Sequence, residues 1–482
     1  MNYRLALHVV GGLLLFLAAM LVTPLPFALW FGDGQWLIFV LSSAITAGAG
    51  LTLYRRFRGP DQLTLREGFA VVTFAWLSFG LFGSLPYLLS GSLLNPADAF
   101  FESMSGFTTC GASVYTNVEA QPKSLLYWRA LTQWIGGMGV IVLGVAVLPL
   151  LGVGGMHLFE AEAAGLSPSA DRLTPRIQDT ARLLWGVYAL ITVVGIALLM
   201  LGDMNFFDAI CHTFAAVASG GFSTRNASVG AFGTYSQLVL ILIMLMGTIN
   251  FSLHYFALRG QVRRYWESIE LRWYLYLWLG VILAVWLANA WHGQYDHWLL
   301  NLRDSTFNVT SVMTTTGFAS ADYGRWPVVT SCLLFLTMFV GGCAGSTSGG
   351  LKQIRLVLLL RHAVHQLTRL IHPRQVLVLK IDGRAVPQAV IQDVLGFAVL
   401  FLGVFLVSTL LLTAVDVDLV TASSASVACL STVGPGFGKA GPMDNYATMP
   451  SFAKLVLCVV MLLGRLEVST VLVLFFLRFW RK

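Results

Sequence analysis

The sequence predicts an all-α integral membrane protein with four repeats of a membrane helix, a short re-entrant helix and a second membrane helix. The repeats are expected in a pseudo-fourfold arrangement, preceded by an extra N-terminal helix pair. Of the 482 residues, 57% are hydrophobic and only 11% are charged, whereas soluble domains carry about 25% charged residues. Long apolar runs alternate with shorter, more polar stretches, and four of these stretches share one tripeptide pattern.

Ten apolar runs are long enough to cross a bilayer core of about 30 Å, which takes about 20 helical residues. They fall near residues 8–31, 36–54, 67–91, 127–152, 183–201, 236–258, 272–291, 327–360, 390–414 and 452–478. The first run is too long for the apolar part of a signal peptide and lacks a small-residue cleavage site, so we expect a retained membrane helix.

Four shorter stretches of intermediate polarity lie between the members of successive pairs of runs, at residues 95–116, 205–226, 302–320 and 419–438. They are too short to span, and non-helical backbone at membrane depth is tolerated only where it lines a watery path or is buried in protein. We therefore expect four re-entrant helices followed by loops. The chain then divides into a helix pair (1–60) and repeats at 61–165, 166–265, 266–384 (its second helix broken) and 385–482.

The basic residues fix the orientation. With the N-terminus cytoplasmic, 22 of the 30 Lys and Arg residues fall on the inner side, as the positive-inside rule predicts. All four re-entrant loops then lie on the outer side and can surround one axis.

Each re-entrant loop contains a Thr or Ser, a second residue and a glycine. The four tripeptides are Thr109-Cys110-Gly111, Ser219-Gly220-Gly221, Thr315-Thr316-Gly317 and Thr432-Val433-Gly434. Carbonyls from four loops can replace the hydration shell of a cation, glycine permits the backbone geometry this needs, and the hydroxyls add acceptors. One such tripeptide would be an ordinary helix contact. Four at matching positions predict a cation-selective filter and make each re-entrant helix a pore helix.

The pore helices, for example Pro96 to Ser105 and Phe206 to Val217, would point their C-terminal carbonyls at a central cavity and favour a cation there. Four acidic residues lie on or near the outer ends of these helices: Asp98, Glu102, Asp208 and Asp304. They could draw cations into the mouth or stabilise the helix N-termini, and the sequence leaves both interpretations open.

Residues 341–350 contain five glycines and interrupt the second helix of the third repeat; each glycine disfavours a helix by about 1 kcal/mol relative to Ala. The predicted gate comprises Gly341, Gly342, Gly345, Ser346, Thr347, Gly349, Gly350, Arg465 and Glu467. Arg465 lies inside the last apolar run, where an arginine is costly unless it is paired. We expect it to hold the glycine-rich segment below the filter; the alternative is a purely structural Arg465–Glu467 or arginine–carbonyl contact.

Other functions find little support. No HExxH, GxSxG or P-loop pattern occurs, and a membrane enzyme would need clustered acid, base or metal ligands, so we expect no enzyme. The six cysteines form no CxxC pair and are interpreted as packing residues. The net charge of +7 lies in membrane loops and does not indicate a nucleic-acid partner.

The repeats, the glycine-rich segment and Gly464-Arg465-Leu466-Glu467 resemble the Trk/Ktr/HKT superfamily of cation transporters over essentially the whole chain. The resemblance implies a K⁺-translocating subunit that forms a homodimer with one pore per protomer. It also implies a cytosolic nucleotide-binding ring of the TrkA type that controls the gate, and no cofactor of the chain's own. Gly111 favours K⁺, because serine at that position accompanies Na⁺ transport in plant relatives. With one matching glycine per loop and no tyrosine, Rb⁺ and some Na⁺ are expected to pass.

The expected function is therefore potassium uptake across a bacterial inner membrane through a gated, channel-like filter, with both termini cytoplasmic. The membrane potential would drive it with about 2.3 kcal/mol per charge per 100 mV. A Na⁺- or H⁺-coupled symporter of the same fold is the alternative. The basic segment from Lys352 to Arg384 is expected to dock a regulatory partner or anionic membrane lipid.

Overall fold

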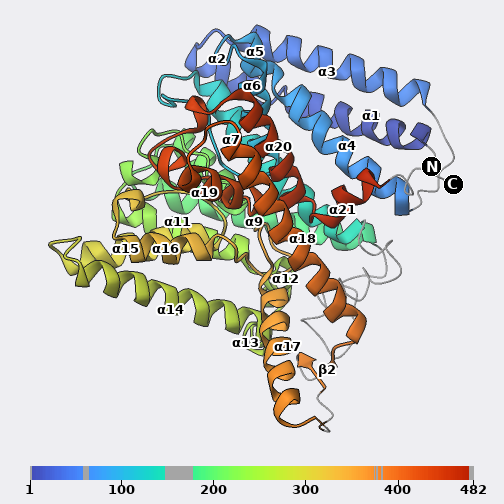
Figure 1. Cartoon of the computed structure of the whole chain (residues 1–482). Helices are drawn as coiled ribbons and strands as arrows, with labels where there is room; N and C mark the ends of the chain where they lie inside the picture. The colour runs from blue at the N-terminus through green and yellow to red at the C-terminus, as the bar shows by residue number, and fades with distance from the viewer. Residues whose placement is uncertain are drawn as a thin grey trace.

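The computed structural model describes residues 3–57, 65–146, 177–373, 375, 378–381 and 384–476. This part of the chain is helical apart from loops and one short antiparallel ribbon of β1 (Lys380–Ile381) and β2 (Arg384–Ala385). The all-α membrane architecture expected from the sequence is confirmed. Figure 1 shows the long helices and, at one end of the molecule, the strand β2.

The N-terminal pair consists of α1 (Tyr3–Met20) with α2 (Leu25–Phe31), and α3 (Trp36–Arg56). Helix α1 packs against α3 and against α4 of the first repeat, as Figure 1 shows. The two helices approach closely at their glycines, since a β-carbon on Gly11 would lie 2.9 Å from the carbonyl oxygen of Gly50. Small residues at such a crossing permit close backbone contact in a membrane.

Four units follow, and each has a long first helix, a short helix and one or more inner helices. The first unit contains α4 (Leu65–Gly83), α5 (Leu85–Leu89), α6 (Pro96–Phe107) and α7 (Lys123–Ala146). The second unit contains α9 (Ile177–Met200), α10 (Phe206–Val217), α11 (Thr234–Thr248) and α12 (Phe251–Leu258), followed by the linking α13 (Arg263–Glu267). The third unit contains α14 (Ile269–Trp291), α15 (Trp298–Met313), α16 (Val328–Thr337) and α17 (Gln353–Ile371), and the fourth contains α18 (Gln388–Thr413), α19 (Leu419–Leu430), α20 (Ser451–Arg465) and α21 (Ser469–Leu472).

The short helices α6, α10, α15 and α19 are the predicted pore helices. Each packs between the long helices of its own unit, and three also touch an inner helix of the preceding unit: α10 contacts α7, α15 contacts α11, and α6 contacts α20. The last of these contacts joins the fourth unit to the first. These contacts therefore link the first, second and third units in order and the fourth unit back to the first.

Membrane-spanning character is clear for part of the predicted set. Among the described residues, six helices or helix pairs are long and apolar enough to cross a bilayer, and two bent pairs also qualify if each counts as one span. The six begin at Tyr3, Trp36, Glu67, Ala181, Ile269 and Gln388. The runs predicted at 127–152 and 327–360 correspond to α7 and to the interrupted α16–α17. The repeat boundaries at residues 60 and 165 lie outside the described ranges and stay predictions.

The inner helices of the second and fourth units differ from the straight runs that hydropathy predicts. Between α11 and α12 the chain bends by 102°, and between α20 and α21 by 113°. Asn250 caps the start of α12 by accepting a hydrogen bond from the Ser252 N–H, and Glu467, with φ of 56°, lies in the second bend. Apolar composition alone carried no signal for these breaks.

Candidate functional site

The four predicted filter tripeptides share one backbone conformation. The first residue of each, a Thr or Ser, has a positive φ of 53° to 56°, and the glycine has a positive φ of 76° to 93°. The first residues are Thr109, Ser219, Thr315 and Thr432, and the glycines are Gly111, Gly221, Gly317 and Gly434. Four loops far apart in the sequence therefore repeat the same two left-handed positions.

The pore helices end in the same way as well. In the first loop, the Thr109 N–H donates to the Gly106 carbonyl and the Cys110 N–H donates to the Ser105 carbonyl; the other three loops repeat both bonds. This is a Schellman ending, which satisfies the last carbonyls of a helix and normally has glycine at its left-handed position. Here that position holds Thr or Ser, and the left-handed backbone conformation costs such a residue about 1 kcal/mol relative to glycine. Because all four loops nevertheless have a hydroxyl residue there, the role of the hydroxyl needs an explanation.

The four loops meet in a ring. A β-carbon built on any of the four glycines would collide with the carbonyl oxygen of the second residue in the next loop. The pairs are Gly111 with Gly220, Gly221 with Thr316, Gly317 with Val433, and Gly434 with Cys110. The last pair returns to the first loop, so the ring closes. These close approaches and the positive φ values both exclude a side chain at the glycine.

The hydroxyls of the tripeptides fall into two classes. Ser219 Oγ lies 3.0 Å from Thr347 Oγ1, and Thr315 Oγ1 accepts a hydrogen bond from the Gly349 N–H at 2.9 Å. Thr109 Oγ1 and Thr432 Oγ1 are buried without a hydrogen-bond partner in the part of the chain described. Buried hydroxyls usually have a partner, so these two oxygens at the ring are exceptions among the described residues.

Each of the first three pore helices also holds the segment that follows its own tripeptide. The contacts come from the residue nine positions before the glycine, namely Glu102, His212 and Asn308. Glu102 accepts hydrogen bonds from Ser113 Oγ and the Val114 N–H, His212 Nε2 lies 2.9 Å from Ser223 Oγ, and Asn308 Nδ2 donates to Ser320 Oγ. This role was not predicted from the sequence for any of the three residues. A polar residue nine positions before each of the first three tripeptide glycines is the pattern that would have indicated it.

The acidic residues near the pore helices are engaged in ion pairs. Glu102 pairs with Arg129 at 2.7 Å, Asp208 with Arg225 at 2.8 Å, Asp304 with Arg303 at 2.9 Å and Asp98 with Lys454 at 2.7 Å.

The end-capping side chains of three pore helices are other residues. Asn95, Asn205 and Asp418 accept the first free N–H groups of α6, α10 and α19. The Thr421 N–H bound to Asp418 lowers the pKa of that carboxyl. Asp98 and Asp208 nevertheless lie in the first turns of α6 and α10, where a carboxylate stabilises a helix N-terminus. Attraction of cations by the four acidic residues stays a prediction.

The glycine-rich segment 341–350 separates α16 from α17 and lies against the inner side of the ring. The Thr347 N–H donates to the Gly247 carbonyl, Ser348 Oγ donates to the Thr314 carbonyl, and Thr347 Oγ1 donates to the Val217 carbonyl. Gly341 and Gly349 also approach each other, because a β-carbon on Gly341 would collide with the Gly349 carbonyl. The segment thus binds the ends of α10, α11 and α15.

Arg465 is buried at the end of α20, with 3% of its surface exposed. Its Nη1 donates to the Thr347 carbonyl at 2.7 Å and its Nη2 donates to the Gly136 carbonyl at 3.1 Å. The predicted contact between this guanidinium and the glycine-rich segment is therefore present, and a second contact reaches the inner helix of the first unit. A buried guanidinium that binds carbonyls on two units joins them.

Glu467 does not pair with Arg465. Its carboxylate binds Arg355 Nη2 at 2.6 Å, across to the start of α17. The basic segment from Lys352 to Arg384 is predicted to dock a partner or lipid, yet Lys352 and Arg355 are both buried, and Lys352 Nζ donates to the Ser348 carbonyl at 2.5 Å. The prediction is wrong for these two residues, because the α17 start turns inward under the glycine-rich segment. Nothing in the amino-acid pattern separates them from the basic residues that follow.

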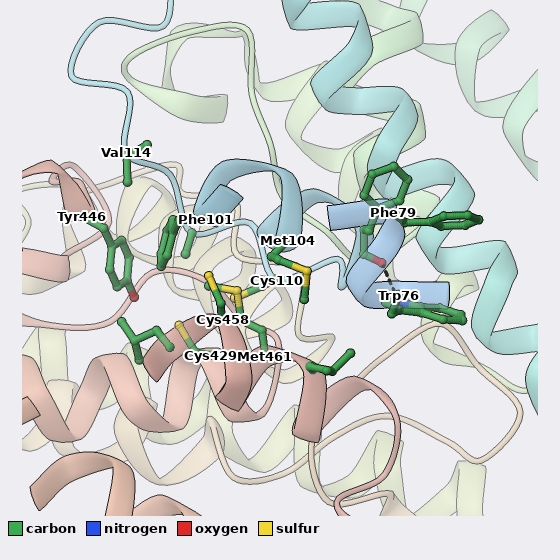
Figure 2. Packing of buried hydrophobic residues seen from close by; sticks show 14 of the residues in the cluster. Trp76, Phe79, Phe101, Met104, Cys110, Val114, Cys429, Tyr446, Cys458 and Met461 are labelled. Carbon is green, nitrogen blue, oxygen red and sulfur yellow. Dashed lines mark hydrogen bonds between the residues drawn. The ribbon is translucent and has the colours of Figure 1, made fainter. Parts of the chain in front are cut away.

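Apolar packing surrounds the first and fourth loops. Figure 2 shows the sulfurs of Cys110, Cys429 and Cys458 gathered between α6, α19 and α20, with Tyr446 beside Phe101. All three thiols are free and buried, as expected for packing residues. Tyr446 also donates its hydroxyl to the Gly434 carbonyl at 2.7 Å. Within the described ranges, no group of three or more His, Cys, Asp or Glu residues could hold a metal ion.

Known proteins resemble this chain along its whole length. The TrkH family, described as cation transport proteins, matches residues 38–292 and 297–481. The Trk system potassium uptake protein TrkH of Halomonas elongata is 42% identical and that of Escherichia coli K12 is 39% identical, with all of both chains covered in each case. The crystal structure of the potassium transporter TrkH from Vibrio parahaemolyticus is 36% identical and superposes with a TM-score of 0.92 over all of both chains. The chain belongs to the TrkH family of cation transport proteins.

Proposed function

We propose that the protein takes up K⁺ through a gated pathway in which the four tripeptides form the selectivity filter. The observation that carries the proposal is the closed ring of four loops with one backbone conformation. Oxygen ligands from several directions are what a dehydrated monovalent cation requires. The relatives at 39–42% identity are potassium uptake proteins by name, and transporters of that kind are not enzymes.

Four pore helices end at the inner side of the ring. Their C-terminal partial negative charges favour a cation that has passed the filter. The membrane potential, negative inside, contributes about 2.3 kcal/mol per charge per 100 mV to inward movement. Thr109 and Thr432 would supply hydroxyl oxygens from opposite ends of the sequence, in addition to the main-chain carbonyls. The filter residues would bind K⁺ in transit, so no resident cofactor is needed.

The glycine-rich segment and Arg465 would form the gate. The segment lies directly beneath the ring through contacts with Thr314 and Thr315, and Arg465 places a positive charge beside it. Opening would require Thr347 to leave the guanidinium. Because Glu467 pairs with Arg355 at the start of α17, a movement of α17 would reach the gate directly.

We further propose a cellular setting for this activity. The protein would work in a bacterial inner membrane with both termini cytoplasmic, as a homodimer with one pore per protomer. A cytosolic nucleotide-binding ring of the TrkA type would act on the exposed part of α17, and regulatory nucleotide would act only through that ring. The half-buried Arg361 and the exposed Arg369 are suited to such a partner or to anionic lipid.

Flux into proteoliposomes tests the proposal. Purified protein is reconstituted, a voltage is set with an ionophore, and Rb⁺ and Na⁺ uptake are measured with and without a pH gradient. We expect voltage-driven Rb⁺ uptake that exceeds Na⁺ uptake. Equal Rb⁺ and Na⁺ flux would overturn the K⁺ assignment. Strict dependence on a Na⁺ or H⁺ gradient would replace the channel-like pathway with a coupled symporter.

A further inference from the structure

One face of α7 runs along the filter loop of the next unit. Arg129, Gln133 and Gly137 are spaced by four residues and therefore lie on one side of the helix. Arg129 Nη1 donates to the Ser223 carbonyl at 3.3 Å, at the outer end of the second loop. At the inner end, Gly137 allows close approach, since a β-carbon there would lie 2.8 Å from Ala218. Gln133 lies between them.

Gln133 makes two hydrogen bonds to the second loop. Its Nε2 donates to the Gly220 carbonyl at 2.6 Å, and its Oε1 accepts from the Phe222 N–H at 3.0 Å. The side chain is completely buried. A β-carbon on Gly220 would lie 2.5 Å from Gln133 Cδ, which explains why the second loop has glycine where the others have Cys110, Thr316 and Val433.

The inner helices of the second and fourth units have no such amide at the matching place. Like α7, each packs a glycine against the last carbonyl of its own pore helix: Gly136 of α7 against Phe107, Gly247 against Val217 and Gly464 against Leu430. This shared contact aligns the helices. Three residues before these glycines stand Gln133, Met244 and Met461, and both methionines are buried. The first unit alone among these three has a polar side chain there.

The consequence concerns the ring itself. The Gly220 carbonyl is one of the four that contact a neighbouring glycine. In the described chain, no hydrogen-bond donor is found for the equivalent carbonyls of Cys110, Thr316 and Val433. A bidentate amide fixes the plane of the Gly220 peptide. A filter discriminates against a smaller ion when its oxygens cannot close around it, and a fixed peptide resists that closure.

We propose that Gln133 is a selectivity-determining positioning residue, which holds the second filter loop at the width of K⁺ and thereby disfavours Na⁺. It acts through Gly220 and does not itself contact the ion. This inference rests on the proposed function, because it assumes that the ring is the filter.

The test compares Gln133→Met, Gln133→Glu and the control Met461→Leu in the reconstituted full chain. Methionine has nearly the same length as glutamine and is the residue at the matching place in the second and fourth units. An ionised glutamate keeps the acceptor for the Phe222 N–H but has no donor for Gly220, whereas a protonated one has both, so this variant is measured at alkaline pH, where the carboxyl is ionised. Leucine for Met461 conserves volume in the matching buried position. The readout is the ratio of Rb⁺ flux to Na⁺ flux in the same vesicles. A loss of folded protein lowers both fluxes by the same factor and leaves this ratio unchanged.

We expect the Rb⁺/Na⁺ ratio to fall roughly tenfold in Gln133→Met and Gln133→Glu, equivalent to about 1.4 kcal/mol, and to stay unchanged in Met461→Leu. The ratio should fall mainly because Na⁺ flux rises. If the wild type prefers Rb⁺ and both Gln133 variants keep the same Rb⁺/Na⁺ ratio, the proposed role of Gln133 is wrong, but the filter assignment is unaffected. A wild type that does not prefer Rb⁺ would overturn the filter assignment instead. If Gln133→Met does not fold, the ratio in the isosteric Gln133→Glu decides.

Discussion

The ring of four tripeptide loops is uniform, whereas the inner helices beneath it differ from one another. At the ring, four loops have the same left-handed positions and the same helix endings. Beneath it, α7 is continuous through Gly136, two of the other inner helices bend by 102° and 113°, and in the third unit a non-helical segment replaces the helix.

The difference follows from what each level must do. A cation bound by equivalent oxygens needs four similar loops around an axis, so departures from symmetry at the ring are costly. Opening and closing needs an element with two arrangements, and one irregular segment held by a few polar contacts is suited to that. Uniform geometry therefore marks the proposed filter, and irregular geometry marks the proposed gate.

The largest effect is expected from a side chain in the ring. In Gly434→Ala, a β-carbon would lie 2.8 Å from Gly111 C, at a φ of +93°. We expect Rb⁺ uptake to fall by at least about 100-fold, because about 3 kcal/mol of misfit changes an equilibrium by more than that factor. The control is Gly403→Ala on α18, where a β-carbon meets nothing within 4 Å. Normal uptake by Gly434→Ala would show that the ring is not the filter.

A smaller change is expected at the gate. Arg465→Ala removes the bonds to the Thr347 and Gly136 carbonyls and also the positive charge. Basal Rb⁺ flux without a cytosolic partner should rise about tenfold, as expected when a closed state loses about 1.4 kcal/mol. Arg465→Lys keeps the charge but not the two-pronged geometry, so it separates the two contributions. Unchanged flux in Arg465→Ala would assign this residue a structural role only.

The pair beside the gate should affect stability more than flux. Glu467→Ala leaves the charge of Arg355, which is 1% exposed, without this carboxylate. We expect a loss of roughly 2 kcal/mol in unfolding free energy, less than the 3–5 kcal/mol for a fully buried pair, because Glu467 is 31% exposed. Thermal unfolding in detergent measures it. Arg355→Met combined with Glu467→Gln should recover most of the loss; a double variant as unstable as the sum of its parts would argue against direct coupling.

Patterns that depend on composition and local backbone chemistry could be predicted from the sequence. The length of the apolar runs predicted membrane helices. The spacing of the four tripeptide glycines predicted four equivalent loops, which meet in one ring in the structure. Arg465 was identified because an arginine in an apolar run needs polar partners, and one of the expected partners, Thr347, is present.

Features that depend on which segments meet in space could not be predicted in this way. Arg355 and Arg361 look alike in a basic segment, yet only the first turns inward to meet Glu467. Gln133 is one polar residue in an apolar helix, and its partner Gly220 lies 87 residues away. The bend at Asn250 depends on a side chain that caps a second helix within a single apolar run. Each of these features is a long-range contact or a local helix cap. Mean hydropathy over a window of residues contains no information about either.

The smallest predicted effect tests why the loops carry a hydroxyl residue at a position that suits glycine. Thr109 has a φ of 53° and a buried Oγ1 with no partner among the described residues. Thr109→Gly should relieve left-handed strain and raise the unfolding free energy by up to about 1 kcal/mol, after allowing for the greater freedom of glycine in the unfolded chain. Rb⁺ flux should nevertheless fall, because a ligand oxygen is lost, whereas Thr109→Ser should keep both hydroxyl and flux. A glycine variant that is more stable and equally active would mean that this hydroxyl serves neither the fold nor the ion.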